Sequence, residues 1–230
     1  MAESVNSLLI VIDTETTGLP PHPDIRPVQV GAVAFNTKTG EEVSEFRVLL
    51  RPDVWAPRYE IAERVHGLTR AHCEMNGIGM RAGFDRFGDW IQGLVRRRPW
   101  TGGDHRFAAW NSNFDRWILS RWQRAAYQGP ATMDQWPPFM VAGCTAPNGC
   151  LQAAYREWTV DKPTLVTPKY GSLKGALRAL GLPPQPLPHD AVSDARLAGL
   201  IWWEMESRYR LDRRLQEIMR EEEESAAMIL

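Results

Sequence analysis

The sequence of 230 residues contains few cysteines and carries almost no net charge, and both features limit the class of protein to which it can belong. Its three cysteines (Cys73, Cys144 and Cys150) are an odd number without C-x-x-C spacing, which argues against a disulfide framework and a zinc cluster. Lysine and arginine together number 27, and aspartate and glutamate 28, so no general basic field indicates a nucleic-acid ligand. These shortages favour a reduced, intracellular protein.

Long apolar runs and two common catalytic motifs are missing as well. The apolar run Leu8–Ile12 is too short for a signal-peptide core or a membrane span, so we expect a cytoplasmic protein without a membrane partner. No G-x-x-x-x-G-K-[ST] loop indicates hydrolysis of nucleoside triphosphates, and no G-x-S-x-G motif indicates an esterase.

Strand-like and helix-like segments follow one another along the chain and predict a single α/β domain. The order indicates a five-stranded mixed sheet flanked by helices, with a core at about 8–203 and a C-terminal helical extension at about 204–230. The expected strands are Leu8–Ile12, Val28–Phe35, Val43–Leu50, Arg106–Trp110 and Pro138–Cys144, and the expected helices are Arg58–His66, Phe84–Arg98, Phe114–Tyr127, Leu151–Trp158, Ser172–Leu180 and Ala191–Met219.

Two acids stand at the end of the first expected strand, in the stretch LLIVIDTETTGLP. Residues two apart in a strand point to the same face, so Asp13 and Glu15 are expected to converge just beyond the carboxyl end of a buried strand. The D-x-E pattern alone is weak, because a chain with this acid content contains it about once by chance. Two unpaired carboxylates there would repel each other and lose hydration unless a cation lay between them.

Two further acids lie on the apolar faces of expected helices. In NSNFDRWILSRWQRAA (residues 111–126) Asp115 falls on the apolar stripe, and in HDAVSDARLAGLIWWEM (residues 189–205) Asp194 does the same. The alternative for each is a first-turn acid favoured by the helix dipole, and it has to apply twice. A lone histidine is more often structural, but His189, five residues before Asp194, can swing over the same site.

Four carboxylates from a strand and two helices are typical of a site for a pair of hard divalent cations, which prefer oxygen ligands. No cluster of cysteine and histidine indicates zinc. The residues therefore indicate metal-assisted chemistry on a phosphate ester.

Three motifs in this order and spacing resemble those of the DEDDh (DnaQ-like) 3′–5′ exonucleases. This family includes the proofreading epsilon subunit of bacterial DNA polymerase III, RNase T and oligoribonuclease. The motifs read VIDTETTGLP, AWNSNFD and HDAVSDA, and the third keeps the H-x-x-x-x-D spacing of the family's His branch. The segments ERVHGLT and SLKGALRALGL are also similar to the family, and the resemblance spans roughly Leu8 to Trp202.

The resemblance implies a ribonuclease H-like fold and hydrolysis of the terminal phosphodiester bond in the 3′ to 5′ direction, releasing nucleoside 5′-monophosphates. It also implies two Mg²⁺ or Mn²⁺ ions and a nucleic-acid substrate with a 3′ end. The implied metal ligands are Asp13, Glu15, Asp115 and Asp194, the implied general base is His189, and Thr16, Gly18, Leu19, His66 and Asn111 are implied along the nucleotide site.

Three features depart from the family pattern and leave the substrate open. Trp110 stands where many proofreading members have histidine, which would alter stacking at the substrate end. Cys144-Thr145 replaces a common Asp-Thr, and the segment 128–150 is atypical.

Alternatives remain in substrate and in activity. Single-stranded DNA ranks first as the substrate, in proofreading or repair, and an RNA-trimming enzyme ranks second, because no feature of the sequence reads the 2′-hydroxyl. A catalytically inactive nucleic-acid-binding module and a ribonuclease H-like endonuclease are the competing activities. A DNA polymerase or a second copy of the chain is a further expected partner, at the C-terminal helix.

Overall fold

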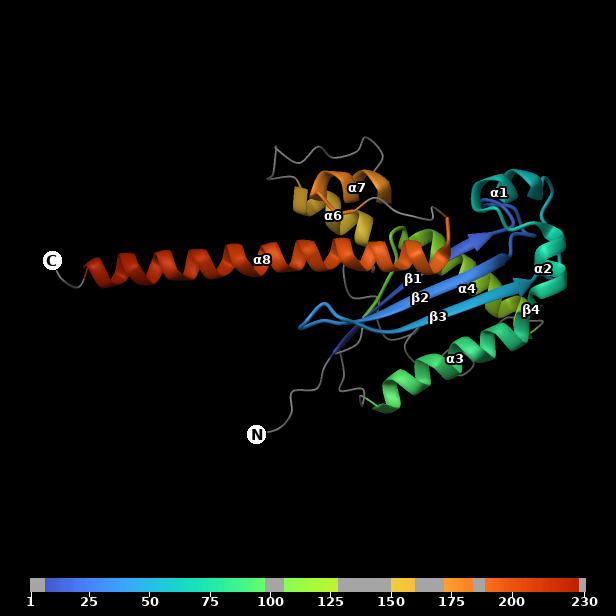
Figure 1. The fold of residues 1–230 in the computed structure, drawn as a ribbon, viewed down its shortest axis with the longest axis horizontal. Coiled ribbons are helices and arrows are strands. Elements are labelled where there is room, and N and C mark those ends of the chain that lie inside the picture. The colour runs from blue at the N-terminus through green and yellow to red at the C-terminus, as the bar shows by residue number, and fades with distance from the viewer. Residues whose placement is uncertain (1–6, 98–105, 128–149, 160–171, 184–188, 228–230) are drawn as a thin grey trace.

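The computed structural model describes residues 7–97, 106–127, 150–159, 172–183 and 189–227, and these residues build a five-stranded sheet covered by helices (Figure 1). The strands are β1 (Leu8–Thr16), β2 (Pro27–Asn36), β3 (Glu42–Arg51), β4 (Ile78–Gly79) and β5 (Arg106–Ala108). Their order is β4-β3-β2-β1-β5. The central pairs β1–β2 and β2–β3 are antiparallel, and the outer pairs β1–β5 and β3–β4 are parallel, so the predicted mixed sheet is confirmed.

Four of the five expected strands are present, and the fifth differs. The strand that completes the sheet is β4, which pairs Leu50 with Ile78 at the end of β3. Two residues carry no alternation of apolar and polar side chains, so the sequence pattern did not reveal this strand. The expected strand Pro138–Cys144 lies outside the described residues.

Helices cover both faces of the sheet because successive side chains of β1 point in opposite directions. The helices are α1 (Tyr59–His66), α2 (Arg70–Asn76), α3 (Met80–Arg97), α4 (Ser112–Tyr127), α6 (Leu151–Thr159), α7 (Leu173–Leu180) and α8 (Ala191–Ala227). Leu8, Ile10 and Ile12 pack against α3 and α4, whereas Leu9 and Val11 pack against α6, α7 and α8. The sequence pattern missed α2, because only Cys73 of its seven residues is buried and no apolar stripe marks it.

One helix, α8, begins against the sheet and then runs past it (Figure 1). It is longer than the expected Ala191–Met219, and it is fastened to β3 by ion pairs of Arg196 with Glu42 and Glu45. The expected boundary at about residue 204 falls inside this continuous helix, so the division into a core and an extension stays a prediction. None of the helices in the described ranges combines the length and apolarity needed to cross a membrane.

Candidate active site

Asp13 and Glu15 lie inside β1, since the strand continues to Thr16. The expectation that they would follow the end of the strand is therefore wrong, and strand pairing gives the reason. On one side β1 still pairs with β2 at Glu15, opposite Gln29, but on the other side its pairing with β5 stops at Val11. No described strand covers that edge of β1 beyond Val11, so the two acids stand at an open edge of the sheet.

Asp115 reaches this open edge from the opposite face of the sheet. The helix α4 starts four residues after the end of β5, so its first turn passes the uncovered part of β1. The Thr14 hydroxyl donates a hydrogen bond of 2.9 Å to Asp115 Oδ1, and the Asp115 side chain is buried. Because Thr14 points away from the face that carries Asp13 and Glu15, acids from both faces meet at this edge.

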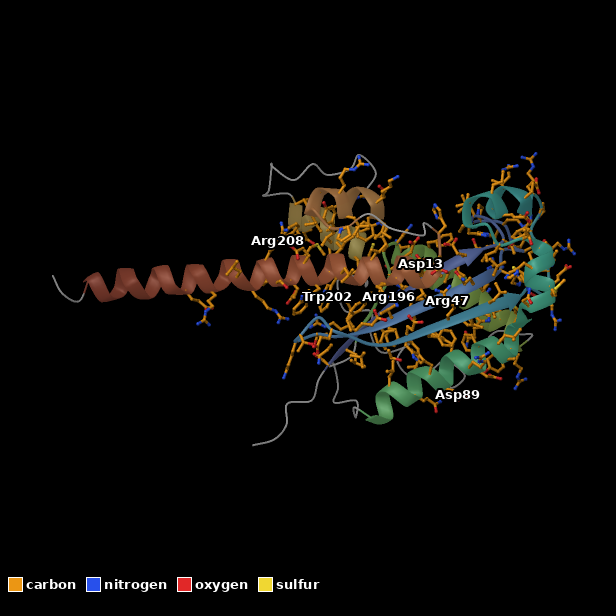
Figure 2. The ribbon with its side chains drawn as sticks, in the orientation of Figure 1. Asp13, Arg47, Asp89, Arg196, Trp202 and Arg208 are labelled. Atoms are coloured by element: carbon orange, nitrogen blue, oxygen red, sulfur yellow. The ribbon has the colours of Figure 1, made fainter. Side chains whose placement is uncertain are left out.

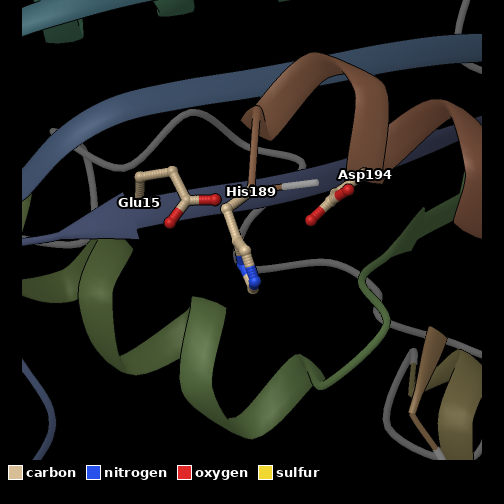
Figure 3. A group of neighbouring side chains, drawn as sticks. All are labelled: Glu15, His189 and Asp194. Atoms are coloured by element: carbon tan, nitrogen blue, oxygen red, sulfur yellow. The ribbon is translucent and has the colours of Figure 1, made fainter. Parts of the chain in front are cut away.

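Asp194 and His189 come from the start of α8, on the same face as Glu15 (Figure 3). One ligand atom from each of Glu15, His189 and Asp194 lies within 4.8 Å of the other two. Figure 3 shows the three side chains around one space, with His189 just before the helix and Asp194 in its first turn. The His189 side chain is exposed, and its backbone has the left-handed φ of 60°.

The residue after His189 fixes the start of α8 to the sheet. Asp190 Oδ1 accepts a hydrogen bond of 3.0 Å from the Ser193 backbone N–H, which is the geometry of a helix N-cap. The Asp190 carboxylate also accepts hydrogen bonds from both terminal nitrogens of Arg47 on β3, and the bond to Oδ1 is 2.9 Å long. Figure 2 labels Arg47 and Asp13 near the first turns of α8. The buried Gln29 accepts a further hydrogen bond of 2.8 Å from the Ala191 N–H. These contacts hold the backbone beside His189 in one place.

A glycine on β2 lets α8 approach the acids closely. Gly31 pairs with Asp13 across the sheet, and a Cβ at Gly31 would lie 2.3 Å from the backbone carbonyl carbon of Ala191 and from the nitrogen of Val192. Backbone atoms cannot rotate away as a flexible side chain can. The absence of a side chain at Gly31 therefore sets how near His189 and Asp194 come to Asp13.

Gly31→Ala is expected to move the first turn of α8 off β2 and to lower the free energy of unfolding by about 1–3 kcal/mol, the usual cost of overpacking a core. Thermal unfolding measures this loss. Gly93→Ala is the matched control, because a Cβ at Gly93 of α3 meets no atom within 4 Å and alanine favours a helix over glycine. Equal unfolding temperatures for the Gly31 variant and the parent would contradict the close approach.

The pKa values of the four acids are raised because these side chains are buried and crowded. Burial, followed by the charges of Asp115, Glu15 and Asp194, raises the pKa of Asp13 well above its usual range. Burial and the neighbouring carboxylates raise the pKa of Glu15 to about 8. Burial also raises the pKa of Asp115 to about 7, although the Thr14 hydrogen bond lowers it, and raises the pKa of Asp194 to about 6. Without a cation the carboxyls of this site therefore hold their protons to a higher pH than isolated carboxyls do.

The donor set fits hard divalent cations. Asp194 Oδ1 is buried and has no hydrogen-bond partner within the described part of the chain, so one oxygen of the site is free to bind an ion. The other donors around it are carboxylate oxygens and one imidazole, a set that suits Mg²⁺ or Mn²⁺. A cation between these carboxylates would offset both their repulsion and their lost hydration.

A cavity of about 560 Å³ opens directly onto the acids. Asp13, Glu15, His189 and Asp194 line it, and so do four of the five residues expected along the nucleotide site: Thr16, Gly18, Leu19 and His66. The fifth, Asn111, is not among the described residues that line it; its carbonyl oxygen accepts the N–H groups of Phe114 and Asp115 at the start of α4. The expectation that Trp110 would affect stacking on the substrate also finds no support, because Trp110 is buried against Tyr155.

His66 joins the end of α1 to the end of β1 at the wall of this cavity. Its Nδ1 accepts a hydrogen bond of 3.1 Å from the Leu68 N–H, so the proton must be on Nε2, which lies 3.1 Å from the Thr16 carbonyl oxygen and donates to it. Burial lowers the pKa of His66, which favours this neutral form.

Other residues of the site were not singled out from the sequence. The helix α1 contributes Ile61 and Val65 to the cavity wall, the turn before it contributes Arg58, and α4 contributes Phe114. Phe114 stands within the motif AWNSNFD, and Asp190 could have been recognised as a helix N-cap from its type and place. Arg47, Gln29 and Gly31 carry no such local signal, because their role depends on the contact between α8 and the sheet.

Comparison with known proteins finds an exonuclease family and several nucleases to which this chain is similar. Residues 10–95 match the model of the exonuclease family (RNase_T). The mouse protein ERI1 exoribonuclease 2 is 24% identical over 214 residues, which cover 86% of this chain and 28% of the relative. The nuclease domain of 3'hExo, a DEDDh family member solved bound to rAMP, superposes with a TM-score of 0.61 at 17% identity, covering 90% of this chain and 95% of that one. Residues 10–95 of this chain are thus similar in sequence to the exonuclease family, and the chain shares the fold of a DEDDh family member.

Other solved nucleases share this fold. Cell-death related nuclease 4 superposes with a TM-score of 0.68 at 14% identity, over 89% of this chain and 65% of that one. E. coli exonuclease I in complex with a dT13 oligonucleotide gives a TM-score of 0.63 at 18% identity, over 91% of this chain and 43% of that one. The ribonuclease H-like fold expected from the sequence is therefore confirmed.

Proposed function

We propose that the chain is a 3′–5′ exonuclease that uses two divalent ions, Mg²⁺ or Mn²⁺, to remove nucleoside 5′-monophosphates from the 3′ end of a nucleic acid. One observation carries this proposal. Asp13, Glu15, Asp115 and Asp194 gather at the open edge of β1, with His189 at the mouth of the same cavity.

The four carboxylates are the proposed ligands of the ions. When bound, divalent ions neutralise the crowded carboxylates, polarise the scissile phosphate and acidify water beside it. Thr14 holds Asp115 by a hydrogen bond, and the Arg47–Asp190 contact holds the turn before Asp194. The protein thus fixes the ligands before substrate arrives.

His189 is the proposed general base. Its exposed side chain, next to Glu15 and Asp194, can accept a proton from a water molecule at a ring nitrogen. The water oxygen then forms a bond to the terminal phosphorus as the bond from phosphorus to the 3′ oxygen of the preceding nucleotide breaks. The leaving 3′ oxygen keeps the electron pair of the broken bond and takes a proton from solvent, and the proton bound by His189 returns to solvent.

The cavity offers separate surfaces to the parts of a terminal nucleotide. Leu19, Ile61 and Val65 form an apolar wall, and 76%, 48% and 52% of their respective surfaces are exposed, which suits contact with a base. The acids line another part of the cavity, where the phosphate would lie. Arg58 is the one arginine among the described residues that line the cavity, and it could pair with a second phosphate.

Two substrate classes follow from different observations. The sequence ranks single-stranded DNA first, in proofreading or repair, whereas the alignment of 86% of this chain with a protein named an exoribonuclease favours RNA. The deciding experiment is degradation of 5′-labelled DNA and RNA of matched sequence, with Mg²⁺, Mn²⁺ or EDTA. We expect a ladder that shortens from the 3′ end only with metal, and the faster substrate identifies the class.

Two controls separate the exonuclease from its alternatives. A circular single strand should stay uncut, and its cleavage would instead support an endonuclease. A catalytically inactive binding module would bind the labelled strands without shortening either of them. We also propose that a DNA polymerase or a second copy of the chain binds α8, and that the protein is cytoplasmic.

Metal is expected to stabilise the protein more at pH 8 than at pH 5.5. The pKa values of Glu15, Asp115 and Asp194 are raised in the fold, to about 8, 7 and 6, above the usual range near 4 of an unfolded chain. The metal-free fold therefore holds these protons more tightly than the unfolded chain does, and it loses stability as the pH rises from about 4 to about 8. Saturating Mn²⁺ should offset this loss of stability. At a concentration of a hundred times its dissociation constant, a bound ion adds about 2.7 kcal/mol to the free energy of unfolding.

Thermal unfolding in EDTA and in Mn²⁺ at the two pH values measures this difference. In EDTA at pH 8, Glu15→Gln is expected to unfold at a higher temperature than the parent, because it removes one buried charge, and to gain less from Mn²⁺. If Mn²⁺ raised the unfolding temperature equally at both pH values and in both proteins, it would not be binding at these carboxyls.

A further inference from the structure

Five arginines line two adjoining cavities at the end of the sheet where Glu15 lies. One cavity, of about 160 Å³, is lined by Arg26, Arg121, Arg124, Asp53 and Ala125. The other, of about 570 Å³, shares Asp53 and Ala125 with it and adds Arg51 and Arg81. We call these five residues (Arg26, Arg51, Arg81, Arg121 and Arg124) the arginine surface. It draws on the loop before β2, the end of β3 and the helices α3 and α4, so no run of basic residues marks it in the sequence.

Most of the charge on the arginine surface is not neutralised within the described part of the chain. Arg26 forms an ion pair with Asp53 at 2.8 Å. Arg81 lies 3.7 Å from Asp85, and the side chains of Arg81 and Asp85 are both well exposed. Arg51, Arg121 and Arg124 form no ion pair with any described residue. Asp53 is the one acid among the described residues that line the two cavities. The surface therefore suits an anionic ligand.

One face of α4 leads from the active-site cavity to the arginine surface. Phe114 lines the active-site cavity, and Trp117, Arg121 and Arg124 follow it at helical spacing. At a rise of 1.5 Å per residue, Arg124 lies about 15 Å along the helix from Phe114. β1 and β3 run in the same direction, because each is antiparallel to β2, so Arg51 at the end of β3 and Glu15 near the end of β1 share one end of the sheet (Figure 1).

Aromatic rings accompany two arginines of this surface. The Arg121 guanidinium lies 4.7 Å from the centre of the Trp117 ring, and that of Arg81 lies 5.1 Å from the centre of the Tyr127 ring. Grooves that bind single-stranded nucleic acids combine cationic side chains for the backbone with aromatic rings for the bases. An isolated small anion would need neither the length of this surface nor its rings.

We propose that the arginine surface binds the phosphate backbone of a single strand a few nucleotides upstream of the 3′ end in the active-site cavity. This proposal rests on the proposed function, because it names where the rest of that substrate lies. A substrate of two nucleotides would end before Arg124, whereas a longer strand would cross the surface. The arginines then add affinity for long strands and leave the chemistry unchanged.

The test uses Arg51→Glu with Arg124→Glu, since both side chains are exposed and neither forms an ion pair with a described residue. Binding of a labelled strand of about 20 nucleotides is measured in EDTA over a range of salt concentrations. We expect the double variant to bind about tenfold more weakly, and the slope of log affinity against log salt to fall by about 1.4, at 0.7 for each lost phosphate contact of a single strand. Hydrolysis of a dinucleotide with Mn²⁺ should not change.

Lys174→Glu with Arg178→Glu is the matched control, because it makes the same charge change on exposed residues of α7. The proposal would be overturned if the arginine variant bound the long strand with the affinity and salt slope of the parent protein. It would also be overturned if the control variant lost as much affinity as the arginine variant, or if the arginine variant lost dinucleotide hydrolysis to the same extent as binding. The binding measurement in EDTA does not depend on catalysis. A parent protein that binds long strands through these arginines and hydrolyses nothing would refute the proposed function alone.

Discussion

Asp13→Asn is expected to abolish the metal-dependent shortening of a labelled strand while the protein stays folded. Asp13 lies at the centre of the site, since the charges of Asp115, Glu15 and Asp194 all raise the pKa of its carboxyl group. An amide of the same size keeps the packing of β1 but binds a divalent ion poorly. Charge stabilisation by a bound metal contributes several kcal/mol to such a reaction, so its loss corresponds to about 10³-fold or more in rate.

The stability of the same variant separates a metal ligand from a structural acid. The carboxylate of Asp13 is repelled by its neighbours when no cation is present, so Asp13→Asn should unfold in EDTA at the same temperature as the parent or a higher one. Asp53→Asn is a matched control, because Asp53 is exposed and pairs with Arg26 away from the acids. A folded Asp13→Asn protein that shortens the strand at the parent rate would remove Asp13 from the site.

His189→Ala is expected to lower the turnover number by about 10²–10⁴-fold, the usual contribution of a general base. The side chain is exposed, so its removal should leave the unfolding temperature nearly unchanged. The rise of that temperature with Mn²⁺ should also persist if His189 handles the proton and the carboxylates hold the ions. Single-turnover hydrolysis and thermal unfolding measure the two effects, and added imidazole should restore part of the rate.

The geometry gives this second experiment a clear alternative result. A ring nitrogen of His189 lies within 4.8 Å of ligand atoms of Glu15 and Asp194, which also suits a metal ligand. Loss of the Mn²⁺-induced rise in unfolding temperature would assign His189 to the metal and contradict its role as the base. His72→Ala, an exposed histidine on α2, should change neither quantity.

The acids of the site could be predicted because each follows from a local pattern. Asp115 and Asp194 fall on the apolar stripes of their helices, and the stripes are buried as expected, from Ile118 to Ala126 on α4 and from Ala198 to Met205 on α8. Asp13 and Glu15 follow a run of apolar residues with no polar break, which indicated a strand buried on both faces. Periodicity within one element reveals which face a side chain occupies, and this information needs no knowledge of the partner element.

The residues that shape the site could not be predicted in this way. Arg47 and Gln29 meet Asp190 and Ala191 from more than 140 positions away in the sequence, and neither has a neighbour that marks the contact. Asn111 stands in the motif AWNSNFD, and its carbonyl oxygen accepts hydrogen bonds at the start of α4. Its expected place along the nucleotide site stays a prediction.

The sequence by itself determined the order of the main elements and the inward direction of four acids, because both depend on spacing along one strand or one helix. Only the tertiary structure decided that these acids meet. The pairing of β5 stops at Val11 and leaves the edge of β1 open, and Gly31 allows α8 to lie against the sheet. Strand register and the approach of a helix to a sheet are set by contacts between distant segments, and local periodicity carries no record of those contacts.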